Sequence, residues 1–568
     1  MNILLNRRFN FNSVQDFKKI LIFLCLLIVP WTLFAELLNF KQIIFYSSLN
    51  IRIFFSNLVF ALFIIIFFRS IFISFLIFYL FNILPFITYY FLRKGIMFSD
   101  LKDIDELMFA LGSFSSTIIY IFFALIIIAA FIINYHYFKI KIFIIQMVCA
   151  ILIFGSFLFS ESYKKILYSK KVDSVVVENL SAAFRFIGPV DAFFFNYLDT
   201  LSFENKLKTN LDKIYYDDFR NFELGNKQLK NIHIIVMESF IDPIDFKYIN
   251  IKKNLIPNKW IEYRKNYLFH GMSPVTGGGS AQAEFEILCG VPSFKKYGTE
   301  FNRIGKKRTK CLPNYLKKFN YKTIASQPVY GSFFNIKNAY KSIGFDEVFL
   351  ANNFNMTEKI NGWLSNESFF SQHFEMIQKS LLEKKPILNY LFAVGCHNSL
   401  GQKQNYEKLI KFNESKNLEG FLNCNLKSIY EILKYTDKIK SIDKDSIIIV
   451  LSDHPPVVSV KALEKSGFQF ACNIKERCSF QKMRGIFLSK DIPIEFKNYG
   501  YYEIPELIIN ELSNNKLCTQ VRCSIDKDYI VHSGNIVYRE SLHKVSNQPD
   551  ISYYDKLYLS ILKDSWIN

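Results

Sequence analysis

Charged residues are nearly absent from long runs between Ile20 and Ser160, although 21% of the whole chain is charged. The later residues have the composition of a Lys- and Asn-rich globular protein, so the averages describe neither part. Internal repeats and low-complexity segments are also lacking. The 61 Phe and 32 Tyr residues exclude a disordered chain, because they bury enough apolar surface to offset the entropy of ordering it. We interpret the chain as a membrane segment followed by a soluble part of roughly 400 residues.

Acidic residues are outnumbered, with 50 Asp and Glu against 69 Lys and Arg, which gives a formal charge of +19. The basic residues are scattered, and no motif of an RNA- or DNA-binding protein accompanies them. We therefore expect no nucleic-acid partner. Attraction to anionic lipid or to an anionic substrate is the better interpretation beside a membrane segment.

The apolar runs predict five transmembrane helices, each near the length that crosses a bilayer. They are Ile20–Leu38, Ile53–Phe68, Ile71–Leu92, Phe114–Ile133 and Ile142–Ser160. Basic residues precede the first helix and favour a cytoplasmic N-terminus, so an odd number of helices places the soluble part outside the cell membrane. Glu36 is the one charged residue within these runs, which indicates an anchor rather than a transporter. The expected location is a cell membrane, as a multi-pass protein with its large domain on the outer side.

The ten cysteines include no CxxC pair and no accompanying histidine pattern of a zinc site. Two close pairs, Cys472/Cys478 and Cys518/Cys523, are suited to disulfides in an oxidising compartment. The pairing of four further cysteines of the soluble part stays open; these are Cys289, Cys311, Cys396 and Cys424.

We divide the chain into residues 1–160 as the transmembrane domain, 161–230 as a juxtamembrane connector of interfacial helices, and 231–568 as the large domain outside the membrane. In the last part, short apolar runs alternate with helical patterns, which predicts an α/β domain with a central, mainly parallel sheet. The expected strands are Ile232–Met237, Thr323–Ser326, Leu388–Val394, Ser446–Leu451 and Met483–Leu488, and the expected helices include Cys311–Phe319 and Leu422–Lys434.

Three of these strands are followed by residues of the types that bind metals or transfer protons in proteins. Glu238 follows the first strand, His397 follows Leu388–Val394, and Asp453-His454 follows Ser446–Leu451. Ligands of open α/β sheets gather at the carboxyl ends of the strands, so these residues are expected to meet. Carboxylate and imidazole ligands suit Mn²⁺, Mg²⁺ or Zn²⁺.

A glycine-rich turn, Thr276-Gly277-Gly278-Gly279-Ser280, precedes a predicted helix with the sequence AQAEFEIL. Ser280 is expected at the N-cap, where free backbone amides and the helix dipole favour a phosphate group. A hydroxyl beside a metal ion at this place is suited to form a covalent phosphoryl enzyme.

These motifs, MESF, GGGSAQAEFEILCG and LSDHPP in this order, resemble the lipoteichoic acid synthase and phosphoglycerol transferase family of the alkaline phosphatase/sulfatase superfamily. The resemblance covers about residues 231–515 and includes five preceding membrane helices. It implies that Glu238, Ser280, Asp453 and His454 bind a divalent metal ion, with Mn²⁺ favoured. Ser280 is then the nucleophile in place of the family's usual threonine, with Thr276 as the fallback, and His397 contacts the transferred group or its leaving oxygen.

The resemblance implies a transferase that moves phosphoglycerol from a membrane phospholipid to a glycan or lipid hydroxyl through a covalent Ser280 intermediate. One departure concerns the head group, because Phe333-Phe334-Asn335-Ile336 stands where the family has a Trp-Asn-Arg run, and Lys337 lies one position late. The alternatives are a phosphoethanolamine transferase, and then a sulfatase-like hydrolase, although Cys289-Gly-Val-Pro-Ser lacks the sulfatase arginine. A binding protein without activity and a transporter are the rivals from other classes.

Overall fold

The structure is a computed structural model of the chain. It describes residue 24 and residues 28–37, 51–68, 77–83, 188–208, 218–225, 229–275, 279–294, 300–331, 333–360, 362–383, 385–397, 409–456, 458–468, 482–489, 494–532, 534–542 and 551–567. The chain divides into two compact units, Met1–Lys206 and Leu207–Asn568.

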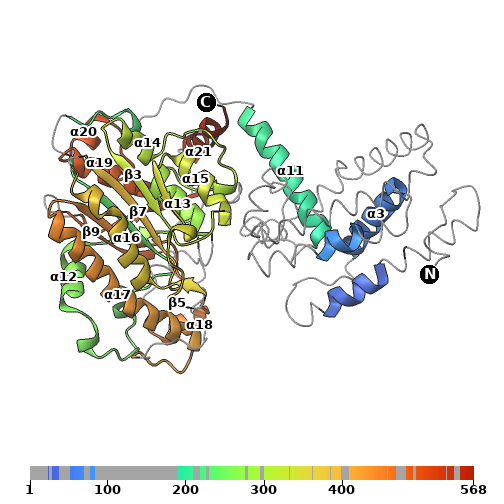
Figure 1. Cartoon of the computed structure of the whole chain (residues 1–568), viewed down its shortest axis with the longest axis horizontal. Helices are drawn as coiled ribbons and strands as arrows, with labels where there is room; N and C mark the ends of the chain where they lie inside the picture. The colour runs from blue at the N-terminus through green and yellow to red at the C-terminus, as the bar shows by residue number, and fades with distance from the viewer. Residues whose placement is uncertain are drawn as a thin grey trace, which may run out of the picture. The chain divides into compact units, whose positions relative to one another are not determined.

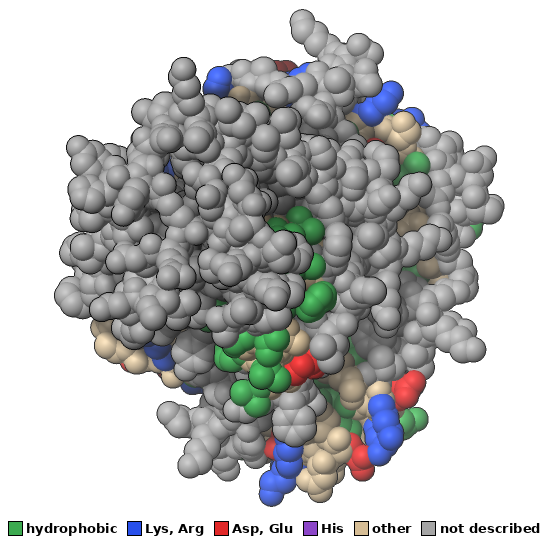
Figure 2. Space-filling view, turned by 90° about the vertical axis from the view of Figure 1, so that its right-hand side faces the viewer, with side chains coloured by type: hydrophobic (Ala, Val, Ile, Leu, Met, Phe, Trp, Pro, Cys, Tyr) green, Lys and Arg blue, Asp and Glu red, His purple; other side chains and the backbone are tan. Residues whose placement is uncertain are grey.

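The first unit contains helical residues 28–37 and 77–83, helix α3 (Ile51–Phe68) and most of helix α11 (Pro189–Lys208). Within it, the rings of Phe60 and Phe81 lie 4.6 Å apart, and Phe81 meets Phe193 edge to face at 5.1 Å. Across the described residues, no helix combines the length and the apolar character needed to cross a membrane. The predicted spans Phe114–Ile133 and Ile142–Ser160, and most of Ile71–Leu92, lie outside the described residues. Described hydrophobic side chains gather near the middle of the face drawn in Figure 2.

The second unit is built on an eight-stranded sheet with the strand order β10-β2-β9-β8-β1-β7-β3-β4. The strands are β1 (Ile232–Met237), β2 (Leu268–Met272), β3 (Lys322–Ser326), β4 (Glu347–Phe349), β7 (Ile387–Ala393), β8 (Ile447–Ser452), β9 (Lys482–Leu488) and β10 (Asn498–Gly500). Neighbouring strands from β8 to β4 are parallel, and β9 is antiparallel to both β8 and β2. The five predicted strands and the mainly parallel α/β sheet are confirmed.

The remaining elements of this unit are helices and short hairpins. The helices are α12 (Asn258–Tyr267), α13 (Ser280–Cys289), α14 (Leu312–Lys317), α15 (Ile336–Ile343), α16 (Asn366–Leu381), α17 (Lys416–Ile442), α18 (Val460–Lys465), α19 (Ile504–Leu512), α20 (Leu517–Gln520) and α21 (Ile551–Ile567). The 3₁₀ turns are η3 (Phe219–Asn221), η4 (Pro243–Asp245), η5 (Lys253–Leu255), η7 (Glu300–Asn302), η8 (Phe333–Asn335), η9 (Ala351–Asn353) and η12 (Tyr501–Glu503). The hairpins pair β5 (Lys359–Ile360) with β6 (Trp363–Leu364) and β11 (Tyr529–His532) with β12 (Asn535–Tyr538).

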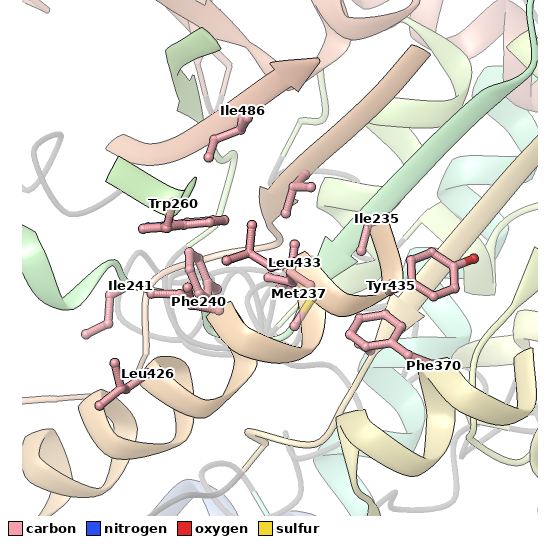
Figure 3. Packing of buried hydrophobic residues seen from close by; sticks show 14 of the residues in the cluster. Ile235, Met237, Phe240, Ile241, Trp260, Phe370, Leu426, Leu433, Tyr435 and Ile486 are labelled. Atoms are coloured by element: carbon pink, nitrogen blue, oxygen red, sulfur yellow. The ribbon is translucent and has the colours of Figure 1, made fainter. Parts of the chain in front are cut away.

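Helices cover both faces of the sheet, with α12, α16 and α17 on one side and α13, α14 and α15 on the other (Figure 1). Strand β1 is buried along its whole length, which explains its continuous apolar sequence IHIIVM. Successive side chains of a strand point to opposite faces, so Ile235 and Met237 share the core with Leu426 and Leu433 of α17 (Figure 3). This packing fixes the end of β1, where the candidate site begins.

Three disulfides link described cysteines of the second unit. Cys518 and Cys523 are paired as predicted. The four cysteines whose pairing the sequence left open form the disulfides Cys289–Cys311 and Cys396–Cys424. Cys472 and Cys478 lie outside the described residues.

Candidate metal centre and active site

The ends of three adjacent strands bring the predicted ligands together. Strands β8, β1 and β7 are neighbours in the sheet and run parallel, so the residues that follow them meet at one edge. Ligand atoms of Glu238, Asp453 and His454 lie within 4.8 Å of one another, and all three residues are buried. Sequence reasoning thus named all three members of this cluster.

The arrangement of His454 and Asp453 is suited to a cation. The ring Nδ1 of His454 lies 2.9 Å from the carbonyl oxygen of Pro455, which only accepts hydrogen bonds, so Nδ1 is the donor. The other ring nitrogen, Nε2, then carries a lone pair and lies 3.1 Å from Oδ2 of Asp453. This oxygen is buried and accepts no hydrogen bond. Because two lone pairs face each other in a dry site, the donor set fits a divalent metal ion.

The two carboxyl groups of the cluster have opposite pKa shifts. Burial, reinforced by the charge of Glu238, raises the pKa of Asp453 to about 6. Burial alone would also raise the pKa of Glu238, but His397 and His454 in their protonated forms, unlike the neutral ring described above, bring positive charges that outweigh burial and lower this pKa to about 2. A positive charge in the cluster would offset the cost of two buried carboxylates.

Ser280 begins helix α13 beside this cluster. Its Oγ lies 3.4 Å from Nε2 of His454. The N-cap is Gly279 rather than the predicted Ser280, because the chain turns into the helix with φ +80° at residue 279, a conformation that favours glycine. Ser280 is therefore the first helical residue, and its hydroxyl remains beside the free amides of the helix N-terminus. The fallback nucleophile Thr276 lies outside the described residues.

His397 lies in the turn after β7, with Nδ1 3.0 Å from Oε1 of Glu238. Its side chain is 32% exposed, so this imidazole is reachable from solvent. The ring of Trp363 meets it edge to face at 4.8 Å, and Phe333 lies 6.1 Å from Trp363. The structure thus joins His397 to the cluster through Glu238.

Trp363 is a neighbour of the site that our sequence reasoning missed. It begins β6 of a two-residue hairpin, and the dipeptide Asn361-Gly362 between the two strands is a strong hairpin signal. Ile336, at the position of the family's arginine, is 1% exposed and begins helix α15. The departure noted in the sequence is therefore a buried apolar residue.

Ser239 is a second neighbour that was missed. It is 4% exposed and has φ +51°, an uncommon conformation for a residue other than glycine. Its backbone N–H donates to Oδ1 of Asp453, and its hydroxyl donates to Oε1 of Glu238, both at 2.8 Å. Nothing in the sequence signals this role beyond its place next to Glu238.

Glu284 lies one helical turn after Ser280 in α13 and is buried. The hydroxyls of Tyr340 and Tyr390 donate to its Oε2 at 2.5 and 3.0 Å. Burial raises the pKa of Glu284 to about 8. This carboxyl group is therefore largely protonated at neutral pH and ties α13 to the neighbouring elements.

Residues 230–477 match the protein-family model described as sulfatase. Over these residues the chain matches the sulfatase family of the alkaline phosphatase superfamily, which confirms the predicted resemblance to that superfamily. No curated protein matches the chain.

Several solved structures are similar to it. The lipoteichoic acid synthase LtaP from Listeria monocytogenes is 16% identical, with 64% of this chain and 97% of that chain covered and a TM-score of 0.47. The Streptococcus pyogenes phosphoglycerol transferase GacH, in complex with sn-glycerol-1-phosphate, is 14% identical, covers 70% and 93%, and has a TM-score of 0.41. The lipooligosaccharide phosphoethanolamine transferase EptA from Neisseria meningitidis, an integral membrane protein, is 12% identical, covers 87% and 95%, and has a TM-score of 0.43.

Proposed function

We propose that this chain is a membrane-anchored, divalent-metal-dependent transferase that moves phosphoglycerol from a phospholipid to a glycan or lipid hydroxyl. The observation that carries the proposal is the serine hydroxyl at a helix N-terminus, 3.4 Å from the imidazole of the buried Glu238–Asp453–His454 cluster. A nucleophile, a cation site and an anion-binding helix end occur together there.

Glu238, Asp453, His454 and Ser280 would hold the ion, with Mn²⁺ favoured over Mg²⁺ or Zn²⁺. When bound, such an ion lowers the pKa of a nearby hydroxyl and stabilises charge on phosphoryl oxygens. The free amides of the first turn of α13 add fixed positive potential where the phosphoryl group must lie.

In the first displacement, Ser280 loses its proton to solvent and its Oγ attacks the phosphorus of the phospholipid head group. A serine–phosphorus bond forms, the bond to the diacylglycerol oxygen breaks, and that oxygen leaves as an alcohol after taking a proton from His397. Because Nδ1 of His397 is held by Glu238, the transfer uses its Nε2.

In the second displacement, a hydroxyl of the acceptor attacks the same phosphorus. His397, now neutral, takes the hydroxyl proton, the bond to Ser280 breaks, and the phosphodiester product leaves with Ser280 restored by a proton from solvent. The five predicted membrane helices would keep the site beside a lipid donor that stays in the bilayer, on the outer side of the cell membrane.

Phosphoethanolamine is the second candidate for the transferred group, and a specific observation favours it. The position of the family's arginine holds buried Ile336, whereas the ring of Trp363 lies beside His397 and that of Phe333 lies next to Trp363. Aromatic rings bind ammonium groups through cation–π attraction, which suits ethanolamine better than glycerol.

Mass spectrometry of the active-site peptide tests both candidates. The full-length protein is incubated with Mn²⁺ and either phosphatidylglycerol or phosphatidylethanolamine, and the mass of the peptide containing Ser280 is then measured. A glycerophosphate adduct is expected, a phosphoethanolamine adduct supports the second candidate, and the absence of any adduct from both lipids contradicts the proposal. The Ser280→Ala protein is the control and should carry no adduct.

A further inference from the structure

The two carboxylates of the metal cluster come from strands that are separated by more than two hundred residues of sequence. Glu238 follows β1 and Asp453 follows β8, and each needs a fixed rotamer for its oxygens to converge on one ion. Asp453 is held by two backbone donors, the N–H groups of Ser239 and His454, at 2.8 and 2.7 Å. Ser239 is the residue that also contacts the other carboxylate.

The backbone around Ser239 is held from several directions. Ahead of it, the N–H of Glu238 donates to the carbonyl of Ala393 on β7. After it, the N–H of Phe240 donates to Oγ of Ser452 on β8 at 2.9 Å. The side-chain amide of Asn425, on α17, reaches the carbonyl of Ser239 at 3.4 Å. These contacts keep residue 239 in its left-handed conformation, and strain of this kind persists only where the surroundings impose it.

The left-handed conformation has a geometric consequence. It turns the chain at the end of β1 so that the N–H of Ser239 faces β8 while its hydroxyl stays on the carboxylate of the preceding residue. One residue thereby fixes an oxygen of each carboxylate and leaves Oδ2 of Asp453 without a hydrogen bond and directed at the cluster.

We infer that Ser239 is a positioning residue that aligns the carboxylates of Glu238 and Asp453 for the divalent ion. This inference rests on the proposed function, because it concerns the proposed metal cluster. Ser239 touches the ligands and takes no part in the chemistry. Its hydroxyl fixes the Glu238 rotamer, and its backbone N–H fixes that of Asp453.

Titration calorimetry with MnCl₂ on chelator-treated, full-length protein tests the inference. Ser239→Ala removes the hydroxyl and retains the backbone donor, so the Kd for Mn²⁺ is expected to rise by about 10- to 100-fold, as when outer-shell partners of metal ligands are removed. Ser239→Gly also removes the hydroxyl but relieves the positive φ, so it secures a folded variant and is expected to show the same weakening.

The matched control is Ser466→Ala, which deletes another buried hydroxyl, one that donates to the carbonyl of Leu463 at 2.6 Å. It should bind Mn²⁺ like the wild type, and its metal-free unfolding temperature should match that of Ser239→Ala. Wild-type affinity in both Ser239 variants would overturn the positioning role. If the wild type itself binds none of Mn²⁺, Mg²⁺ and Zn²⁺, the proposed metal function is overturned, and the positioning role with it. The wild-type titration therefore distinguishes failure of the proposed function from failure of the positioning role alone.

Discussion

Two regions of this domain contain buried acidic side chains, and they differ in how the negative charge is balanced. Glu503 receives two hydrogen bonds from the guanidinium of Arg539, at 2.9 and 2.8 Å, and Arg539 also donates to carbonyls of Asn498 and Ser524. Glu238 and Asp453 are equally buried, but their ion-pair partners within the described residues are histidines alone. Glu503 has a permanent cation as its partner, whereas the carboxylates of the cluster face each other and imidazole rings, which are charged only when protonated.

This difference in charge balance indicates that the Arg539–Glu503 pair, and not the Glu238–Asp453–His454 cluster, stabilises the fold. The Arg539–Glu503 pair satisfies its own charges and joins the turn after β12 to η12, so it is complete in the chain itself. An added positive charge at the Glu238–Asp453–His454 cluster would offset the burial of its carboxylates, a cost that the raised pKa of Asp453 reflects. The predictions below follow from this contrast.

Replacing Ser280, the proposed nucleophile, has the largest expected effect. Ser280→Ala should lower the rate of head-group transfer by about a thousandfold or more, because the covalent route is lost. Ser280→Thr retains a hydroxyl and should keep the rate within about tenfold of the wild type. Transfer is measured with a labelled lipid donor, and full activity of Ser280→Ala would show that Ser280 is not the nucleophile.

Breaking the Arg539–Glu503 pair should lower the free energy of unfolding. Arg539→Met leaves Glu503 buried without a cation, which is expected to cost about 3–5 kcal/mol of the free energy of unfolding. Denaturant titration measures this change, and the metal content should stay unchanged in the protein that remains folded. A loss below about 1 kcal/mol would mean that the pair contributes little to stability.

Removing a charge from the cluster should raise the free energy of unfolding, whereas breaking the Arg539–Glu503 pair lowers it. The pKa of Asp453 is raised from 3.8 to about 6, so its charge destabilises the metal-free fold fully above pH 6 and not at all below pH 3.8. Asp453→Asn should therefore stabilise the metal-free protein at pH 7, by about 1–3 kcal/mol. The asparagine amide also supplies a donor to Nε2 of His454. Denaturant titration in the presence of a chelator measures the gain, and a loss of stability would contradict the contrast.

Two of the three described disulfides, one next to His397 and one distant from it in sequence, should also differ in their effect on transfer. Cys396–Cys424 ties the turn that bears His397 to α17, whereas Cys518–Cys523 joins residues five apart in the sequence. Replacing the first pair by serine should lower the transfer rate by about tenfold, because a displaced proton donor loses alignment with the leaving oxygen. The second pair replaced by serine is the control, and equal rates for both variants would show that the first disulfide has no role at the site.

The smallest effect concerns pH. The pKa of Glu284 is raised from 4.5 to about 8, so its stabilising protonated form is complete below pH 4.5 and is lost as the pH rises through 8. Between pH 6 and 8 this group should reduce the free energy of unfolding by roughly 1 kcal/mol per pH unit. Glu284→Gln should flatten that slope in metal-free protein, as followed by denaturant titration at each pH, and an unchanged slope would assign it to other groups.

The sequence predicted the strands and the grouping of the candidate ligands because both follow from local pattern. Continuous apolar runs marked β1, β7 and β8, and the polar residues directly after β1 and β8 are the candidate ligands that the sheet brings together. Local pattern also placed the start of α13 within one residue.

What the sequence did not predict depends on contacts between distant segments. The partners Cys289–Cys311 and Cys396–Cys424 were left open because disulfide connectivity follows from the fold and not from spacing. The left-handed turn at Ser239 is imposed by β7, β8 and α17 together, so no local signal marks it. Trp363 differs, because its Asn-Gly turn was visible in the sequence.

The most direct test of the central claim is the metal content of the full-length protein. Elemental analysis should find one tightly bound divalent ion per chain in the wild type and none in Asp453→Asn, with Arg539→Met as the control that disturbs an acidic group outside the cluster. Equal metal content in the wild type and Asp453→Asn would contradict the assignment of the cluster as the metal site.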